Sequence, residues 1–397
     1  MPAMSQVRAV SATRIYRGLS PVCTMGSVMS QIFLPNTRLS PYHAATEAAG
    51  ATEYMVYNHM YMPLDYGRPP TEDYRALREA VTLWDVGAER QVQIQGPDAV
   101  AFAGYLVTRD ISDLPAGHCR YVLVCDETGR VICDPVLLRP FDDTIWLSHG
   151  SVDLLLWAKG IALHTDHDVR VTEADVSPLQ LQGPKSRDVL HRLIGDSVDG
   201  LAYYDCMPAI IADHDVIVSR TGWSGELGYE IFPLGAPGAT RIWDAIVRAG
   251  EPSGLVVTGP NVAHAIESGI TDCQYHTNFE VNALEFSSRL VDLDKPAFVG
   301  QDALREIAAQ GVRRRTIGLL GGPDRLPRLQ WAWTVHRDGS EVGRLRWAAF
   351  SPALERMIAI AVIDADHADP GLVVSVHHHA GEVEMETTTL PFIPRRA

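Results

Sequence analysis

The sequence is short of cysteine, of clustered basic charge and of long apolar runs. Its 397 residues contain six cysteines and no C-x-x-C pair, which argues against a disulfide framework or a tetrahedral zinc site and favours reduced thiols in the cytoplasm. The formal net charge is −15 and no basic stripe is present, so neither nucleic acid nor an anionic membrane is an expected partner. The apolar run 154–163 is too short to span a bilayer and contains Lys159.

Several common catalytic motifs are also absent. The glycine-rich stretch 219–232, SRTGWSGELGYEIF, has neither the G-x-G-x-x-G of a dinucleotide fold nor the G-x-x-x-x-G-K-[ST] of a P-loop. Ser224 lies in an incomplete G-x-S-x-G, which argues against a serine hydrolase. The histidines of 164–168 are expected in a turn and those of 377–379 on alternating faces of a strand, so we interpret both groups as solvated and expect no metal.

Residues 1–28 differ from the rest of the chain. They contain three arginines but no Asp, Glu or Lys, a composition typical of a transit peptide. The tripeptide M-S-Q at 4–6 recurs at 29–31, which favours the other interpretation, a start assigned too early with Met29 as the true beginning. We treat 1–28 as disordered or wrongly included.

Helical and strand patterns alternate between residues 50 and 310. The spacing predicts helices at 71–87, 97–107, 151–163, 239–250 and 261–269, strands at 90–96, 144–150, 215–221 and 229–234, and a β-hairpin over 120–141. Q-I-Q-G-P-D-A at 93–99 and Q-L-Q-G-P-K-S at 180–186 indicate a strand, turn and helix that occur twice, or common turn chemistry. From about 311 only short strands remain, which predicts a terminal β-barrel or sandwich after an α+β region.

Two carboxylates stand in apolar strands where they are costly to bury. Asp134 lies in VICDPVLL and Glu230 in YEIF, and a buried carboxylate needs a partner or takes up a proton. Either could pair with an arginine such as Arg220. Because Tyr121 and Trp223 share their hairpins, the same pattern also suits a planar ligand rich in nitrogen.

Seven phrases follow one another along the chain: YMPLDYG (61–67), LWDVGAERQVQIQGPDA (83–99), RYVLVCDETGRVICDPV (120–136), LQLQGPKS (179–186), SRTGWSGELGYEI (219–231), IESG (266–269) and FVGQDAL (298–304). In this order they resemble the glycine-cleavage aminomethyltransferase (T-protein) superfamily. The resemblance implies a three-domain cloverleaf of the α+β type with a C-terminal β-barrel. It divides the chain into domain 1, which binds folate (29–85 plus 173–255), domain 2 (86–172 plus 256–310) and the barrel (311–397).

The resemblance also implies an enzyme that transfers a one-carbon unit to tetrahydrofolate. On that basis Asp134 and Glu230 bind the pterin together with Tyr121 and Tyr204, while Trp223 lies at the reacting group. Asp134 and Trp223 would be the catalytic residues. We further expect the glycines of 222–228 to let the backbone pass close to a bound ring.

Within the superfamily, YNHMYMP (57–63) is similar to the Y-N-H-M-x-x-P of the dimethylsulfoniopropionate (DMSP) demethylases. This similarity assigns Asn58, His59 and Met60, with Trp223, to a small-molecule methyl donor. S-G-E-L-G (224–228) instead matches the aminomethyltransferase sequence. The alternatives are therefore an aminomethyltransferase, a demethylase of a betaine, methylated amine or methoxy-arene, and a folate-binding protein without turnover. A cytoplasmic homodimer is expected.

Overall fold

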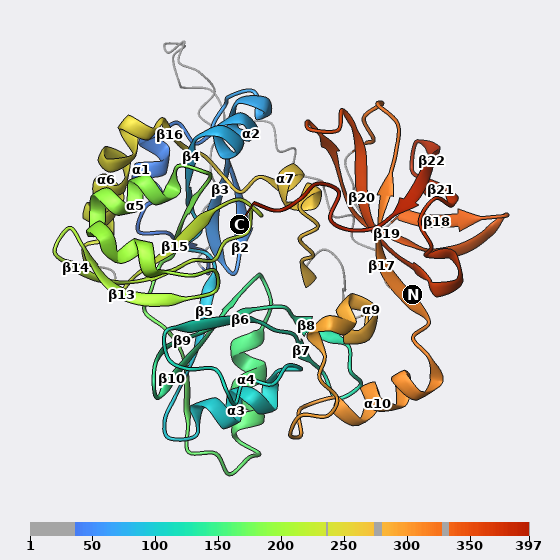
Figure 1. Cartoon of the computed structure of the whole chain (residues 1–397), viewed down its shortest axis with the longest axis horizontal. Coiled ribbons are helices and arrows are strands. Elements are labelled where there is room, and N and C mark those ends of the chain that lie inside the picture. The colour runs from blue at the N-terminus through green and yellow to red at the C-terminus, as the bar shows by residue number, and fades with distance from the viewer. Residues whose placement is uncertain (1–35, 236, 274–279, 328–332, 397) are drawn as a thin grey trace, which may run out of the picture. The chain divides into compact units, whose positions relative to one another are not determined.

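The protein is described by a computed structural model that places residues 36–235, 237–273, 280–327 and 333–396 (Figure 1). The expectations for residues 1–28 lie outside the described residues and stay predictions. The described part contains a three-stranded sheet, a five-stranded sheet, a six-stranded sheet, a two-stranded ribbon and a closed barrel. The predicted α+β class with an all-β C-terminal region is therefore confirmed.

The small sheet begins the described chain. It consists of β1 (Arg38–Leu39), β2 (Glu53–Tyr57) and β3 (Met60–Asp65) in the order β1-β3-β2. β2 and β3 form an antiparallel hairpin whose two turn residues, Asn58 and His59, both have left-handed φ angles of 48° and 60°. Two successive positive φ angles are the pattern of a tight type I′ turn, which Asn tolerates better than most residues.

The six-stranded sheet carries one half of the apolar core. In spatial order its strands are β13 (Cys206–Ile211), β14 (His214–Ser219), β15 (Gly228–Pro233), β12 (Leu179–Gln182), β4 (Val81–Asp85) and β16 (Leu255–Val257). Leu181 and Ile231 of this sheet share a buried cluster with Ile242 and Ile246 of α6 (Ala239–Gly250). The apolar face of α6 thus covers one face of the sheet.

The predicted helix over 71–87 is wrong in its second half. α2 (Pro70–Glu79) ends early, and the next residues form β4 between β12 and β16. All five residues of β4 are buried. A short, continuously apolar segment of this kind cannot be distinguished from a buried helix by periodicity alone, and here strand pairing on both sides decides.

The five-stranded sheet carries the predicted hairpin. Its order is β11 (Arg170–Glu173), β5 (Arg90–Gln95), β10 (Thr144–His149), β9 (Val136–Phe141) and β6 (His118–Tyr121). β7 (Val124–Cys125) and β8 (Val131–Cys133) extend the hairpin between β6 and β9, as the two apolar runs predicted.

The remaining helices cover these sheets and join the parts of the chain. They are α1 (His43–Ala48), α3 (Ala99–Leu106), α4 (Leu154–Ala162), α5 (Ser186–Ile194), α7 (Val262–Glu267), α9 (Ala283–Ser287) and α10 (Gln301–Gln310), with 3₁₀ turns at Gly195–Gly200, Glu251–Ser253, Ser288–Leu290 and Ala365–His367. α4 begins three residues later than predicted, because the hydroxyl of Ser151 accepts the backbone N–H of Asn58 instead of capping the helix.

The repeated phrase has a common structural basis. β5 leads into α3 through Gly96, and β12 leads into α5 through Gly183, with φ angles of 143° and 124°. A Cβ on Gly96 would overlap the carbonyl oxygen of Asp168, and one on Gly183 would lie 2.7 Å from the carbonyl oxygen of Ala80. Both copies therefore use glycine for a close backbone approach.

The C-terminal region is a closed barrel in the order β17 (Arg314–Leu320), β20 (Arg356–Asp364), β19 (Ser340–Ser351), β18 (Trp333–Arg337), β21 (Val373–His378) and β22 (Gly381–Thr388), with β22 pairing back to β17. In the described part of the chain, no helix is long and apolar enough to cross a membrane.

Candidate functional site

A cavity lies where the β2–β3 hairpin, the β6–β9 hairpin and the six-stranded sheet meet. Its aromatic lining comes from four segments of the chain: Tyr57, Tyr121, Tyr203 with Tyr204, and Trp223. Its carboxyl groups are those of Glu89, Asp134, Glu226, Glu230 and Asp272. The structure therefore brings the four residues predicted to bind folate, Tyr121, Asp134, Tyr204 and Glu230, into one cavity together with Trp223, which was predicted at the reacting group.

Asp134 is fixed between two donors. The Tyr121 hydroxyl donates a hydrogen bond of 2.6 Å to its Oδ2, and the backbone N–H of Cys273 donates one of 3.2 Å to its Oδ1. Burial raises the pKa of the Asp134 carboxyl, although these hydrogen bonds oppose the shift. Burial also raises the pKa of Tyr121, and the neighbouring Asp134 charge adds to the effect. Asp134 is thus a preorganised carboxyl with enhanced proton affinity.

Glu230 belongs to a polar cluster on adjacent strands. Gln180 donates from Nε2 to Glu230 Oε1 at 3.0 Å, and the hydroxyl of Thr221 donates to Oε2. Burial raises the pKa of Glu230 despite these bonds. The alternative of an ion pair with Arg220 is wrong, because the Arg220 guanidinium donates to the carbonyl of Leu201 and forms no ion pair with Glu230 within the described residues.

The two aromatic residues that the sequence indicated reach the cavity from different loops. Trp223 lies between β14 and β15, its ring centroid 5.5 Å from that of Trp347 in the barrel. Tyr204 precedes β13 with a φ of 67° and packs edge-on against Tyr203, 4.6 Å between centroids. Both rings thus have a packed neighbour that fixes their orientation.

The glycines of 222–228 have a further role that was not expected. A Cβ on Gly222 or Gly228 would overlap the side chain of Gln182, and one on Gly225 would overlap Ser268. Gln182 in turn accepts a hydrogen bond of 2.6 Å from the Ser224 hydroxyl. These glycines therefore make room for buried polar side chains of the protein itself, and all three also line the cavity.

Of the four residues that the sequence assigned to the methyl donor, Trp223 lines the cavity and Asn58, His59 and Met60 do not. Asn58 is buried, and its amide donates to the carbonyls of Ala88 and His149 at 3.0 and 3.3 Å. His59 is exposed in the turn, and Met60 belongs to a buried apolar cluster. The hairpin instead contributes Met55, Tyr57, Met62 and Leu64 to the lining.

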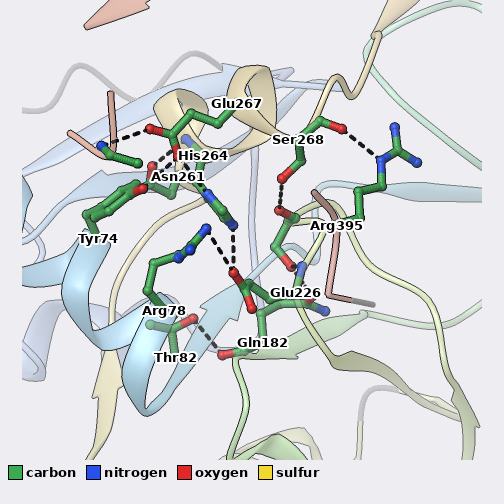
Figure 2. Close-up of polar contacts among 12 residues, drawn as sticks. Tyr74, Arg78, Thr82, Gln182, Glu226, Asn261, His264, Glu267, Ser268 and Arg395 are labelled. Carbon is green, nitrogen blue, oxygen red and sulfur yellow. Dashed lines mark hydrogen bonds and ion pairs between the residues drawn. The ribbon is translucent and has the colours of Figure 1, made fainter. Parts of the chain in front are cut away.

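A buried histidine lies beside the cavity between two carboxylates (Figure 2). His264 contacts Glu226 at 3.0 Å through Nε2 and Glu267 at 2.9 Å through Nδ1. Glu226 also pairs with Arg78 at 3.3 Å, and Glu267 accepts the hydroxyl of Tyr74 at 2.7 Å. Burial alone would lower the pKa of His264, but hydrogen bonds to the two carboxylates outweigh it and raise the pKa.

Glu267 extends this network into the barrel, because it also accepts the hydroxyl of Ser351 in β19. The network was not predicted from the sequence. The I-E-S-G phrase contains Glu267, and His264 lies three residues before it. One histidine and one glutamate at this spacing on a short helix do not by themselves predict such a network.

Glu89 and Gln180 were also missed. Glu89 ends the turn after β4, and Gln180 lies at the centre of β12 next to Glu230. Gln180 Nε2 contacts Glu89 Oε1 at 3.4 Å as well as Glu230. Glu89 lies in the W-D-V-G-A-E-R phrase just before β5, but no local pattern distinguished it from an exposed turn residue.

Three possible metal ligands meet at Asp134. The ligand atoms of Cys133, Asp134 and Cys273 lie within 4.8 Å of one another. Burial raises the pKa of the Cys133 thiol, and the pKa of Cys273 is raised by its hydrogen bond to Cys133 and by burial. In the absence of a metal these three groups therefore favour their protonated forms.

Two family models match almost the whole described chain. The GCVT N-terminal domain matches residues 42–295, and the glycine cleavage T-protein C-terminal barrel domain matches residues 314–393. The chain belongs to the glycine cleavage T-protein family. The predicted family and the prediction of an enzyme of the transferase class are thereby confirmed.

Individual members of the glycine cleavage T-protein family show the range of similarity. The dimethylsulfoniopropionate demethylase DmdA from Ruegeria pomeroyi is 34% identical and is covered over 95% of its length, with 88% of this chain aligned. An aminomethyltransferase from Saccharopolyspora erythraea is 29% identical, with 92% of this chain and 100% of the relative aligned. The crystal structure of the glycine cleavage system aminomethyltransferase T from Bartonella henselae is 20% identical and superposes with a TM-score of 0.80 over 90% of this chain and 99% of that chain, so the fold is the same.

Proposed function

We propose that this protein is a tetrahydrofolate-dependent demethylase that moves a methyl group from DMSP, or from a similar methylated onium compound, to N5 of tetrahydrofolate. The observation that carries the proposal is the single cavity in which Asp134 and Glu230 face aromatic side chains. The similarity to the DmdA relative supports the choice of donor.

The residues present fit a pterin. A pterin is a flat ring with several N–H groups, and carboxylates accept from such groups while aromatic faces stack on the ring. Tyr121 and the backbone of Cys273 already orient Asp134. Binding a ring N–H therefore costs little conformational entropy at this side chain. Glu230 is likewise fixed by Gln180 and Thr221.

Tetrahydrofolate supplies N5 as the methyl acceptor. In the balanced transfer the S–CH₃ bond breaks, its electron pair stays on sulfur as a neutral thioether, a C–N5 bond forms and the N5 proton is released. The sulfonium is already a good leaving group, so the protein's main contributions are alignment and exclusion of water, which supply several kcal/mol. Asp134, whose pKa is raised by burial, accepts a hydrogen bond from the ring and is suited to hold the released proton.

On the donor side, Trp223 offers a ring face to the cationic centre. Asn58, His59 and Met60 act indirectly in this proposal, through the hairpin that places Met55, Tyr57 and Met62 in the cavity wall.

A second candidate is an aminomethyltransferase. It is favoured by Glu226 of the S-G-E-L-G phrase, which His264 and Arg78 hold at the cavity wall. An aminomethyl substrate needs more proton management than a sulfonium, and this buried network could provide it.

The test is to incubate the full chain with tetrahydrofolate and DMSP and to assay 5-methyl-tetrahydrofolate together with the demethylated thioether. Both products in equal amounts are expected. If 5-methyl-tetrahydrofolate forms with glycine betaine or a methoxybenzoate but not with DMSP, the protein is still a folate-dependent demethylase, and DMSP is overturned as the donor. Turnover only with an aminomethyl-loaded lipoyl carrier would favour the second candidate, and folate binding without any turnover would indicate a binding protein.

A further inference from the structure

Glu89 occupies a fixed position in the cavity wall. It ends the turn Val86–Glu89 between β4 and β5, where its backbone N–H donates to the carbonyl of Val86 at 2.8 Å. Asp85 stabilises the same turn, because its Oδ1 accepts the N–H of Gly87 at 3.0 Å. The amide of Asn58 then holds the carbonyl of Ala88, the residue immediately before Glu89. The side chain is therefore presented by a rigid segment at the junction of two sheets.

Three of the other four carboxyl groups of the wall, Asp134, Glu226 and Glu230, have compensating partners. Glu226 is paired with Arg78 and His264. Asp134 accepts hydrogen bonds from Tyr121 and Cys273.

Glu230 likewise accepts hydrogen bonds from Gln180 and Thr221. The two guanidinium groups of the wall are used elsewhere, since Arg220 donates to the carbonyl of Leu201 and Arg395 to the carbonyls of Ser268 and Gly269.

Glu89 is less well compensated than these groups. Its contact with Gln180 Nε2 is 3.4 Å long, and Gln180 is shared with Glu230. Ion pairs to Glu89 are absent among the described residues. Because Gln180 Nε2 contacts Oε1 of Glu89 at 3.4 Å and Oε1 of Glu230 at 3.0 Å, the two carboxyl groups are neighbours. Two adjacent carboxyl groups cannot both be charged unless a proton or a cation lies between them.

We infer that Glu89 determines the charge of the methyl donor: its carboxylate, which lies beside the folate-side Glu230, binds the positively charged centre of a sulfonium or quaternary ammonium compound. This inference rests on the proposed function and names the substrate class by its charge. An onium centre has no N–H or O–H to donate, so it is recognised by negative charge and by aromatic faces alone. The same cavity wall contains the rings of Tyr57 and Trp223.

The proton on Glu89 gives the mechanism of selection. Burial and the charges of Glu230 and Asp272 raise its pKa well above the usual range. In the absence of a donor the proton limits the charge of the pair to −1, and an arriving cation replaces this proton. An uncharged molecule of the same shape cannot replace the proton, so the carboxyl groups of Glu89 and Glu230 add nothing to its binding free energy.

The experiment uses the full chain loaded with 5-methyl-tetrahydrofolate, so that no turnover occurs during calorimetry. DMSP is compared with 4-methylpentanoate, in which carbon replaces sulfur without the charge, and glycine betaine is compared with 3,3-dimethylbutanoate. In Glu89→Gln the affinity for the preferred cation is expected to fall about tenfold, the size of one partly buried charge contact, while affinity for the uncharged isostere is unchanged. Glu127→Gln, at an exposed position on the 126–130 turn, is the matched control.

A second readout does not depend on a variant. Titrations in two buffers of different ionisation enthalpy should show that cation binding releases protons from the unmodified protein, and that Glu89→Gln releases fewer. Equal losses for the cation and its isostere, absence of proton release, or failure of both cations to bind would each overturn the inference. If the unmodified protein transfers methyl groups but Glu89→Gln keeps the same preference for the cation over its isostere, the inference is overturned and the proposed function stands. If the unmodified protein prefers the cation but transfers no methyl group from any donor, only the proposed function is overturned.

Discussion

The side chain of Asn58 donates a hydrogen bond of 3.0 Å to the carbonyl of Ala88, and Ala88 directly precedes Glu89. The tight turn of the β2–β3 hairpin is thereby attached to the turn between β4 and β5. A residue that does not itself line the cavity can in this way fix one that does.

Asn58→Ala should weaken cation binding through Glu89. The substitution removes two buried hydrogen bonds and leaves the carbonyls of Ala88 and His149 without that donor, so the free energy of unfolding should fall by about 2 kcal/mol. Urea unfolding gives the stability, and calorimetry of DMSP binding gives the functional effect. His59→Ala, at the exposed neighbouring position, is the control. Unchanged DMSP affinity in a destabilised Asn58→Ala would show that the hairpin is only structural.

Asp134→Ala should abolish folate binding. The variant removes the carboxyl that Tyr121 and Cys273 orient, and with it the acceptor proposed for the ring N–H groups. Tyr121→Phe keeps the ring and loses only the orienting hydroxyl, so its folate affinity should fall less, by about tenfold. Equilibrium binding of tetrahydrofolate measured by fluorescence distinguishes the two variants. Folate affinity in Asp134→Ala equal to that of the unmodified protein would remove Asp134 from the site.

The histidine network should make stability depend on pH. The pKa of His264 in the folded protein is raised above its unfolded value near 6.5, so its contribution is fully present below about pH 6.5 and is lost as pH rises through the folded pKa. Urea unfolding between pH 6 and pH 9 should therefore show a decline that His264→Gln lacks. The variant itself should be less stable by about 3 kcal/mol at pH 6, because Glu226 and Glu267 lose a buried charged partner. Parallel pH profiles for the two proteins would contradict this account.

Gly228→Ala should destabilise the protein for a steric reason alone. The new methyl group would overlap the Gln182 side chain, which holds Ser224 and contacts the carbonyl of Thr221. A loss of about 1–3 kcal/mol and weaker folate binding are expected, because Thr221 bonds Glu230. The control is Gly160→Ala in α4, where no atom lies within 4 Å of the added methyl group, and there stability should rise slightly. Thermal unfolding of both variants compares them directly.

The sequence predicted the parts of the site that have an unusual local signal. Asp134 and Glu230 were recognisable because a carboxyl in an apolar strand must have a partner, and Tyr121 and Trp223 because they share the same hairpins. The family resemblance added Tyr204. The β6–β9 hairpin and the barrel were predicted from alternation and turn residues. The proposed domain boundaries stay a prediction, as do the roles of the individual site residues.

The other features of the fold and site could not be predicted from local sequence, because they depend on contacts between distant segments. β4 was assigned to a helix because its burial depends on β12 and β16, which lie far away in the sequence. Glu89 became notable only when β12 and β15 placed Gln180 and Glu230 beside it. The glycines of 222–228 looked like a ligand contact, and only the packing of Gln182 and Ser268 shows what occupies the space beside them.

The close, tilted contact between Trp223 and Trp347 gives the protein an internal optical reporter. One indole belongs to the cavity wall and the other to the barrel, with centroids 5.5 Å apart. Two indoles at that separation couple their electronic transitions, so near-ultraviolet circular dichroism should contain a paired signal that Trp347→Phe removes. A ligand that displaces the Trp223 ring would change this signal without any label, and occupancy of the site could be followed in the native chain.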